Sequence, residues 1–68
     1  MSNLKLWRQR RGMSQAQLAK ASGVSIRMIQ YYEQGKNDIN RAEALSVYRL
    51  AQALTCSMEA LLETDDAL

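Results

Sequence analysis

The stretch from Ser14 to Gly35, SQAQLAKASGVSIRMIQYYEQG, decides the fold. Ser14 and Gln17 have the spacing of a capping box, in which each side chain bonds the backbone N–H of the other, so a helix begins there. A tight turn at Gly23 separates this helix from a second one that Ser25 caps. Gly35 closes the second helix, because glycine takes the left-handed conformation at little cost. The stretch therefore predicts two short helices joined by a tight turn.

Three more helices are expected outside this stretch. The first runs from about Asn3 to Arg11 and stops at Gly12. A fourth covers about Arg41 to Leu54, and a fifth follows the capping residue Ser57. The fourth offers five apolar residues for burial: Leu45, Tyr48, Leu50, Ala51 and Leu54. Core positions are also expected at Trp7, Leu18, Val24, Ile29 and Leu61.

Length and composition limit what the chain can do. The 68 residues fit one domain, residues 1–68, without room for a deep cleft. The chain has no His and a single Cys, Cys56, so it lacks the usual general base and the residues of a zinc site. We expect no enzyme activity, no metal and no cofactor. Without a long apolar run or a signal peptide, we expect no membrane contact and a cytoplasmic location.

Charge is divided unevenly along the chain. Residues 1–41 hold eight basic and two acidic residues, a net charge of +6, whereas residues 42–68 hold one basic and five acidic, a net charge of −4. The acidic end includes a tail, residues 64–68, that is expected to fray. A basic N-terminal part and an acidic C-terminal part are typical of a protein that binds a polyanion. Charged residues that serve only to keep the surface hydrated would give the same net charges, so the charge alone does not decide between the two interpretations.

The second helix of the central stretch has a polar side. At 100° per residue, Arg27, Gln30, Tyr31 and Gln34 share one arc, with Ile26 at its edge. Arginine and glutamine can form paired hydrogen bonds with guanine and adenine, and an aliphatic side chain can touch a thymine methyl. An ordinary amphipathic helix with a solvated face would show the same pattern, so the arc alone does not decide between the two.

Taken together, these features resemble the phage repressor and Cro type, or XRE-type, helix-turn-helix domain. The similarity covers about residues 4–62. It is carried by Leu4-Lys5-Leu6-Trp7-Arg8, Arg11-Gly12-Met13-Ser14-Gln15, Gln17-Leu18-Ala19, Ser22-Gly23-Val24-Ser25, Ile29, Tyr32-Glu33-Gln34-Gly35-Lys36, Leu50-Ala51-Gln52-Ala53-Leu54, Ser57 and Leu61-Leu62. One departure is Thr55, which stands where the family usually has glycine at the end of the fourth helix. Threonine tolerates the left-handed conformation poorly, so we expect that corner to be built differently.

The resemblance implies an all-α, compact five-helix fold of the lambda-repressor type, with the helix-turn-helix at about residues 15–34 and its second helix in the DNA major groove. It implies base contacts from Ile26, Arg27, Gln30 and Tyr31. It implies phosphate contacts from Gln15, Ser25, Gln34, Lys36 and Asn37. It also implies a structural ion pair between Arg8 and Glu33. Because the family tends to have a small apolar residue at position 56, it implies a buried thiol at Cys56.

The expected partner is double-stranded DNA, bound sequence-specifically by a homodimer on two half-sites, because one domain of this size covers little DNA. The alternative is a protein-interaction module on the same fold, as in an antitoxin, because a fold does not dictate a function. An interaction module would present an apolar patch on the second helix of the central stretch, whereas a DNA reader would keep that surface polar and flanked by positive charge.

Overall fold

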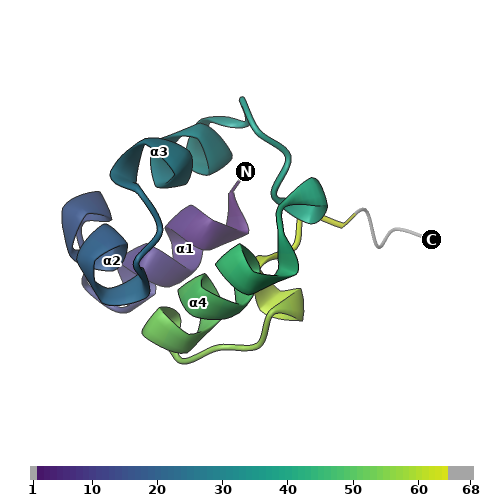
Figure 1. Cartoon of the computed structure of the whole chain (residues 1–68). Helices are drawn as coiled ribbons and strands as arrows, with labels where there is room; N and C mark the ends of the chain where they lie inside the picture. The colour runs from purple at the N-terminus through teal and green to yellow at the C-terminus, as the bar shows by residue number, and fades with distance from the viewer. Residues whose placement is uncertain (1, 65–68) are drawn as a thin grey trace.

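The computed structural model describes residues 2–64, and within them the chain is all-helical, as predicted (Figure 1). The helices are α1 (Asn3–Arg10), α2 (Gln15–Ser22), α3 (Ile26–Gln34) and α4 (Ala44–Leu54), and the 3-10 turns are η1 (Ile39–Arg41) and η2 (Glu59–Leu61). α3 and α4 lie on opposite sides of the core, and α1 and α2 close it at the back and at one end (Figure 1). None of the helices in residues 2–64 is long and apolar enough to span a bilayer.

The local signals of the central stretch formed as predicted. The Ser14 Oγ accepts a hydrogen bond from the Gln17 N–H at 3.0 Å, and the Gln17 Oε1 accepts one from the Ser14 N–H at 2.8 Å. Gly23 ends α2 with a φ of 76°. The Ser25 Oγ then accepts a bond from the backbone at the start of α3 at 3.2 Å. The bonds of Ser14 and Gln17 thus fix the start of α2, and Gly23 and Ser25 fix the two ends of the turn between α2 and α3.

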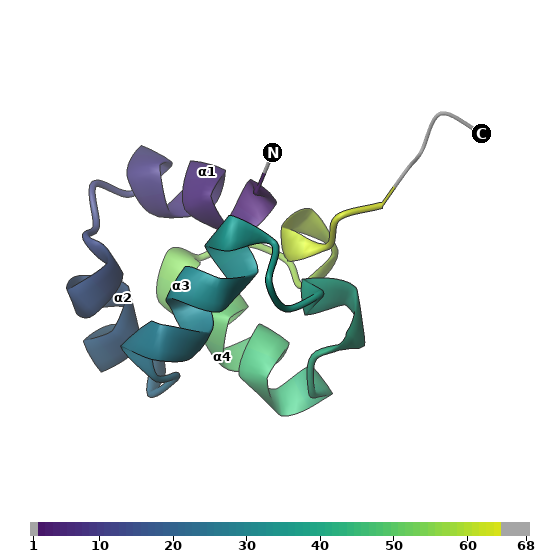
Figure 2. The same cartoon turned by 90° about the horizontal axis from the view of Figure 1, so that it is seen from above.

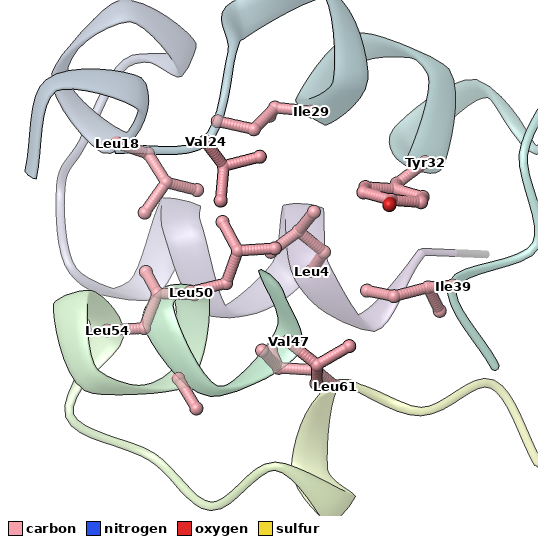
Figure 3. Close-up of a cluster of buried hydrophobic side chains, with 11 residues drawn as sticks. Leu4, Leu18, Val24, Ile29, Tyr32, Ile39, Val47, Leu50, Leu54 and Leu61 are labelled. Atoms are coloured by element: carbon pink, nitrogen blue, oxygen red, sulfur yellow. The ribbon is translucent and has the colours of Figure 1, made fainter. Parts of the chain in front are cut away.

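One apolar cluster joins all the elements (Figure 3). Its fully buried side chains are Leu4, Leu18, Ile29, Leu50, Leu54 and Leu61, and Val24, Tyr32, Ile39, Val47 and Ala51 complete it. Each aliphatic side chain of this size contributes about 1.5–3 kcal/mol to folding when it is fully buried. Trp7 is only partly buried against the cluster, with the Arg10 and Arg11 guanidinium carbons each 5.3 Å from the centre of its ring.

The predicted burial of Leu45 and Tyr48 was wrong. Their exposed fractions are 55% and 49%, whereas Val47 is buried. The sequence ALSVYRLAQAL is apolar around much of the helix, and only the stripe that begins at Val47 and repeats at helical spacing meets the core. The prediction therefore failed because the pattern alone does not say which of two apolar stripes the other elements cover.

The predicted fifth helix is the 3-10 turn η2, so the described chain has four α-helices. The Asn3 Nδ2 donates to the Leu62 carbonyl at 2.8 Å, and Leu62 is already extended. The Asn40 amide donates to the Glu63 carbonyl and accepts from the Glu63 N–H, each at 2.7 Å. Because these side chains satisfy the backbone groups, the segment does not need helical bonds. Residues 65–68 of the predicted acidic tail lie outside the described residues.

The corner after α4 keeps the geometry that a glycine would give. Thr55 has φ 56° and ψ 49°, so the expectation of a differently built corner was wrong. This left-handed conformation costs a non-glycine residue about 1–2 kcal/mol. Arg11 offsets the cost, because its Nε donates to the Leu54 carbonyl at 2.7 Å and its Nη2 to the Thr55 carbonyl at 3.1 Å. The neighbouring Cys56 is only partly buried, and this burial raises the pKa of its thiol.

Candidate nucleic-acid interface

The predicted arc of α3 faces solvent. Ile29 and Tyr32 turn the opposite side of the helix into the core. Ile26 is 42% exposed and Arg27 and Gln34 are exposed, while Gln30 and Tyr31 are partly buried. In Figure 2, which looks down on the top of the molecule as drawn in Figure 1, α3 is the helix nearest the viewer. The arc therefore lies on an outer surface that no other element covers.

A buried ion pair fixes α3 against α1. The Arg8 Nε donates to the Glu33 Oε2 at 2.7 Å, and the Arg8 Nη2 donates to the Glu33 Oε1 at 2.9 Å. Their side chains are only 12% and 4% exposed. The third donor, the Arg8 Nη1, bonds the Met13 carbonyl at 2.8 Å in the loop before α2. Hydrogen bonding to Glu33 raises the pKa of Arg8, so the guanidinium stays charged. One arginine thus connects α1, α3 and the entry to α2.

Gln15 links this ion pair to the exposed arc. Its Nε2 donates to the Glu33 Oε1 at 3.1 Å, and its Oε1 accepts from the Gln30 Nε2 at 3.4 Å. A carboxylate can only accept, so the Gln15 amide must turn its NH2 group toward Glu33 and its carbonyl toward Gln30. Gln30 in turn must offer its NH2 group to Gln15. The amide orientations of both glutamines are therefore set from inside the domain.

The sequence predicted Gln15 and Gln30 as separate contact residues and did not predict this chain of hydrogen bonds. The bonds join residues 18 and 15 positions apart in the sequence. They depend on the crossing of α2 and α3, and no local pattern encodes that crossing. The one signal in the sequence is the glutamine at the first position of α2, because the capping box of Ser14 and Gln17 does not require a glutamine there.

The residues that follow α3 have two different environments. Lys36 is exposed, and its Nζ lies 5.4 Å from the centre of the Tyr31 ring, within the range of a cation–π contact. Asn37 is partly buried, and its Nδ2 points to the Met28 sulfur at 3.8 Å. At the other end of α3, the exposed Ser25 uses its oxygen as the cap and keeps its hydroxyl proton for a further partner.

Only part of the basic charge remains available to a polyanion. Arg8 is held inside the domain by Glu33, whereas Arg11 is exposed and donates to the carbonyls of Leu54 and Thr55. Arg27 and Lys36 are exposed on α3 and directly after it. Positive charge therefore flanks the arc at two positions.

Comparison with known proteins adds one positive finding. The family described as "Helix-turn-helix" matches residues 4–61, a range that begins at the second residue of α1 and ends at the last residue of η2. Neither the curated proteins nor the solved structures contain a significant match to the chain.

Proposed function

Because the chain belongs to the XRE-type helix-turn-helix family, in which the phage repressor and Cro domains are found, we propose that it is a sequence-specific, double-stranded-DNA-binding transcription regulator. In this proposal α3 enters the major groove and its exposed arc reads base edges. The observation that carries the proposal is the link from Glu33 through Gln15 to Gln30, because it orients an amide on an open surface before any ligand arrives.

Gln30 has the groups that recognise adenine. One of its amide hydrogens is directed to Gln15, which leaves the second hydrogen and the carbonyl oxygen for a partner. Adenine offers a matching acceptor at N7 and donor at N6 in the major groove. On the same arc, Arg27 would pair with guanine and Ile26 would contact a thymine methyl. Tyr31 completes the proposed base-reading set.

Phosphate contacts would hold the domain in register on the duplex. We assign them to Gln15, Ser25, Gln34 and Lys36. Gln15 keeps one amide hydrogen, Ser25 its hydroxyl proton, and Lys36 a full positive charge. The Asn37 Nδ2 already points to a sulfur atom inside the domain, so we assign no DNA contact to that nitrogen.

A single domain of this kind covers about 600–1,000 Å² on DNA, which gives limited specificity. We therefore propose that two copies bind two half-sites as a homodimer. The protein-interaction alternative requires an apolar patch on α3, but Ile26 is the only apolar member of the exposed arc. The polar character of the arc supports DNA as the partner.

Selection of bound fragments from random duplex DNA tests this function. The wild type should enrich a sequence with two related half-sites. Gln30→Ala should lose preference at an A·T pair, while the matched change of an exposed α1 glutamine, Gln9→Ala, should leave the enriched sequence unchanged. Failure of the wild type to enrich any sequence would overturn the proposal.

A further inference from the structure

The oxygen of the Gln30 amide is the free end of the chain of hydrogen bonds that begins at Glu33. The Gln30 Nε2 donates to the Gln15 Oε1 at 3.4 Å, whereas the Gln30 Oε1 accepts no hydrogen bond from residues 2–64. Gln30 is only partly buried, and no buried polar side-chain atom in the described part of the chain lacks a partner. The Gln30 oxygen therefore reaches the surface as a free acceptor.

The opposite orientation of this amide is unfavourable. A rotation of the Gln30 amide by half a turn would set its oxygen against the Gln15 oxygen, and both atoms can only accept. A rotation of the Gln15 amide would not relieve this, because its oxygen would then face the Glu33 carboxylate. Glu33 is itself only 4% exposed and is held by two hydrogen bonds from Arg8. The acceptor on α3 therefore has one favoured orientation.

The N6 group of adenine carries the hydrogen that this acceptor would bind. In duplex DNA one N6 hydrogen pairs with thymine, and the other points into the major groove. In N6-methyladenine the remaining hydrogen keeps the pair with thymine, so the methyl group takes the position in the groove. A methyl group is larger than a hydrogen atom and is not a conventional donor. It would stand against the Gln30 oxygen and leave that oxygen without a partner.

We propose that N6-methylation of the adenine read by α3 excludes the protein from its DNA site, and that Gln30 is the residue that detects the methyl group. This inference rests on the proposed function, in which Gln30 reads adenine. It adds a regulatory input to that function, because the methylation state of the duplex then decides whether the site is occupied. The chain of hydrogen bonds from Glu33 through Gln15 is what prevents Gln30 from adapting to the modified base.

The sensitivity should be confined to one base pair. A guanine read by Arg27 offers N7 and O6, and a thymine beside Ile26 offers its own methyl group, so neither contact involves adenine N6. A site built to bond a hydrogen discriminates against an analogue that lacks it, because a polar group is left unpaired. The loss should be of the size of one wrong base pair, about tenfold to a hundredfold in affinity.

The first test compares two duplexes of the selected sequence that differ in one methyl group. Selections with the wild type and with Gln30→Ala identify the A·T pair that Gln30 reads. N6-methyladenine at that pair should lower the affinity of the wild type about tenfold to a hundredfold. The same modified base in the flanking sequence is the DNA control and should leave the affinity unchanged. Equal affinity for the duplex methylated at the A·T pair and the unmethylated duplex would overturn the inference.

Gln30→Leu separates detection by this side chain from an indirect effect of the methyl group on the duplex. Leucine is of similar size but has no acceptor, so affinity for the unmethylated duplex should fall and the ratio of the two affinities should approach one. Gln9→Ala, an exposed change on α1, is the protein control and should keep the wild-type ratio. Each ratio compares two duplexes with the same protein, so a loss of folded protein does not change it. A wild-type ratio in Gln30→Leu would overturn the inference.

Gln15→Met tests whether Gln15 positions the Gln30 amide. Without the Gln15 oxygen, the Gln30 amide can rotate away from the methyl group, so the ratio of the two affinities should fall below that of the wild type. Loss of a phosphate contact by Gln15 would weaken binding to both duplexes equally and leave the ratio unchanged. An unchanged ratio in Gln15→Met would therefore overturn the fixed orientation as the cause of the discrimination.

The selection experiment distinguishes failure of the proposed function from failure of this inference. A wild type that enriches no sequence would overturn the proposed function, and the inference with it. A wild type that enriches a sequence through Gln30 and binds its N6-methylated form equally well would overturn the inference alone.

Discussion

The Arg8 guanidinium holds the Glu33 carboxylate through two hydrogen bonds of 2.7 and 2.9 Å, although neither residue belongs to the exposed arc of α3. Glu33 also accepts from Gln15, which in turn bonds Gln30 on that arc. The ion pair therefore has two roles. It fixes α3 against α1, and it orients the amide that we propose as a reader of adenine.

Removal of one partner of this ion pair should destabilise the domain strongly. Arg8→Met or Glu33→Gln leaves the other residue with a poorly satisfied charge at a nearly buried position, which typically costs about 3–5 kcal/mol. A domain of this size has a total stability of about the same magnitude. The double change should cost less than the sum of the single changes, because it leaves no unpaired charge.

Thermal unfolding by circular dichroism checks this prediction for the two single variants and the double variant. Additive shifts in melting temperature would mean that the two side chains do not interact. DNA affinity measured on the folded fraction should also fall for Glu33→Gln, because the Gln15 amide then loses an ionised acceptor.

Thr55→Gly should stabilise the domain. Thr55 occupies a left-handed conformation that glycine adopts freely, so the change relieves about 1 kcal/mol of backbone strain. The conformational entropy that glycine adds to the unfolded chain offsets part of this gain in stability. The melting temperature should rise by a few degrees, on the scale of about 4–8 °C per kcal/mol for a domain of this size.

The reverse change at Gly23 provides the control. Gly23 has a φ of 76°, and nothing lies within 4 Å of a Cβ placed there, so Gly23→Ala should destabilise through backbone strain alone. A melting temperature that falls for Thr55→Gly would show that the Thr55 side chain contributes more than its conformation costs.

Alkaline pH should destabilise the domain through Tyr32. Burial, with a smaller contribution from the charge of Glu43, raises the pKa of Tyr32 above its ordinary value of 10.0. The neutral phenol is therefore favoured in the folded state, so its contribution to stability is complete at neutral pH. It is lost as the pH rises above 10.0 through the raised pKa, because the unfolded chain ionises first.

Urea unfolding as a function of pH measures this effect in two variants. Tyr32→Phe should lose less stability above pH 10.0 than the wild type, whereas Tyr48→Phe, at an exposed position, should follow the wild type. Equal alkaline losses in the wild type and Tyr32→Phe would assign the effect to other groups.

Lys36→Ala should weaken binding to all DNA sequences and flatten the plot of log K against log salt concentration by about one unit, because it removes the phosphate contact that we propose for Lys36. Binding to a half-site duplex over a range of salt concentrations gives the slope. Arg49→Ala, an exposed change on α4, which lies across the core from α3, should leave the half-site slope unchanged. An unchanged slope for Lys36→Ala would place this lysine away from the DNA backbone.

The predicted helix caps were accurate, whereas the predicted fifth helix, where distant contacts decide the conformation, was wrong. Ser14 and Ser25 cap helices because their partners lie three residues away, so the sequence contains the whole interaction. The end of the chain as far as residue 64 could not be predicted in the same way. Asn3 and Asn40 fix its backbone from 59 and 23 residues away, and they replace a helix with an extended segment.

The same distinction applies to the candidate site. The helical period of α3 predicted which residues share the exposed arc, because periodicity is a local property. The resemblance to repressor domains suggested the pairing of Arg8 with Glu33, but the position of Gln15 between Glu33 and Gln30 requires three helices to be in place. Burial of α4 failed for a related reason, since Leu45 and Val47 are equally apolar and only the tertiary structure distinguishes them.

The most direct test of the base-reading role of α3 is the affinity of Arg27→Ala for its best selected duplex and for random duplex DNA, measured side by side. Arg27 is exposed on the arc and takes part in no ion pair within residues 2–64. The change should cost about 1–3 kcal/mol on the selected duplex, relax the preference at one G·C pair, and cost much less on random DNA. An equal loss on both duplexes would contradict base reading by Arg27 and make it a phosphate contact.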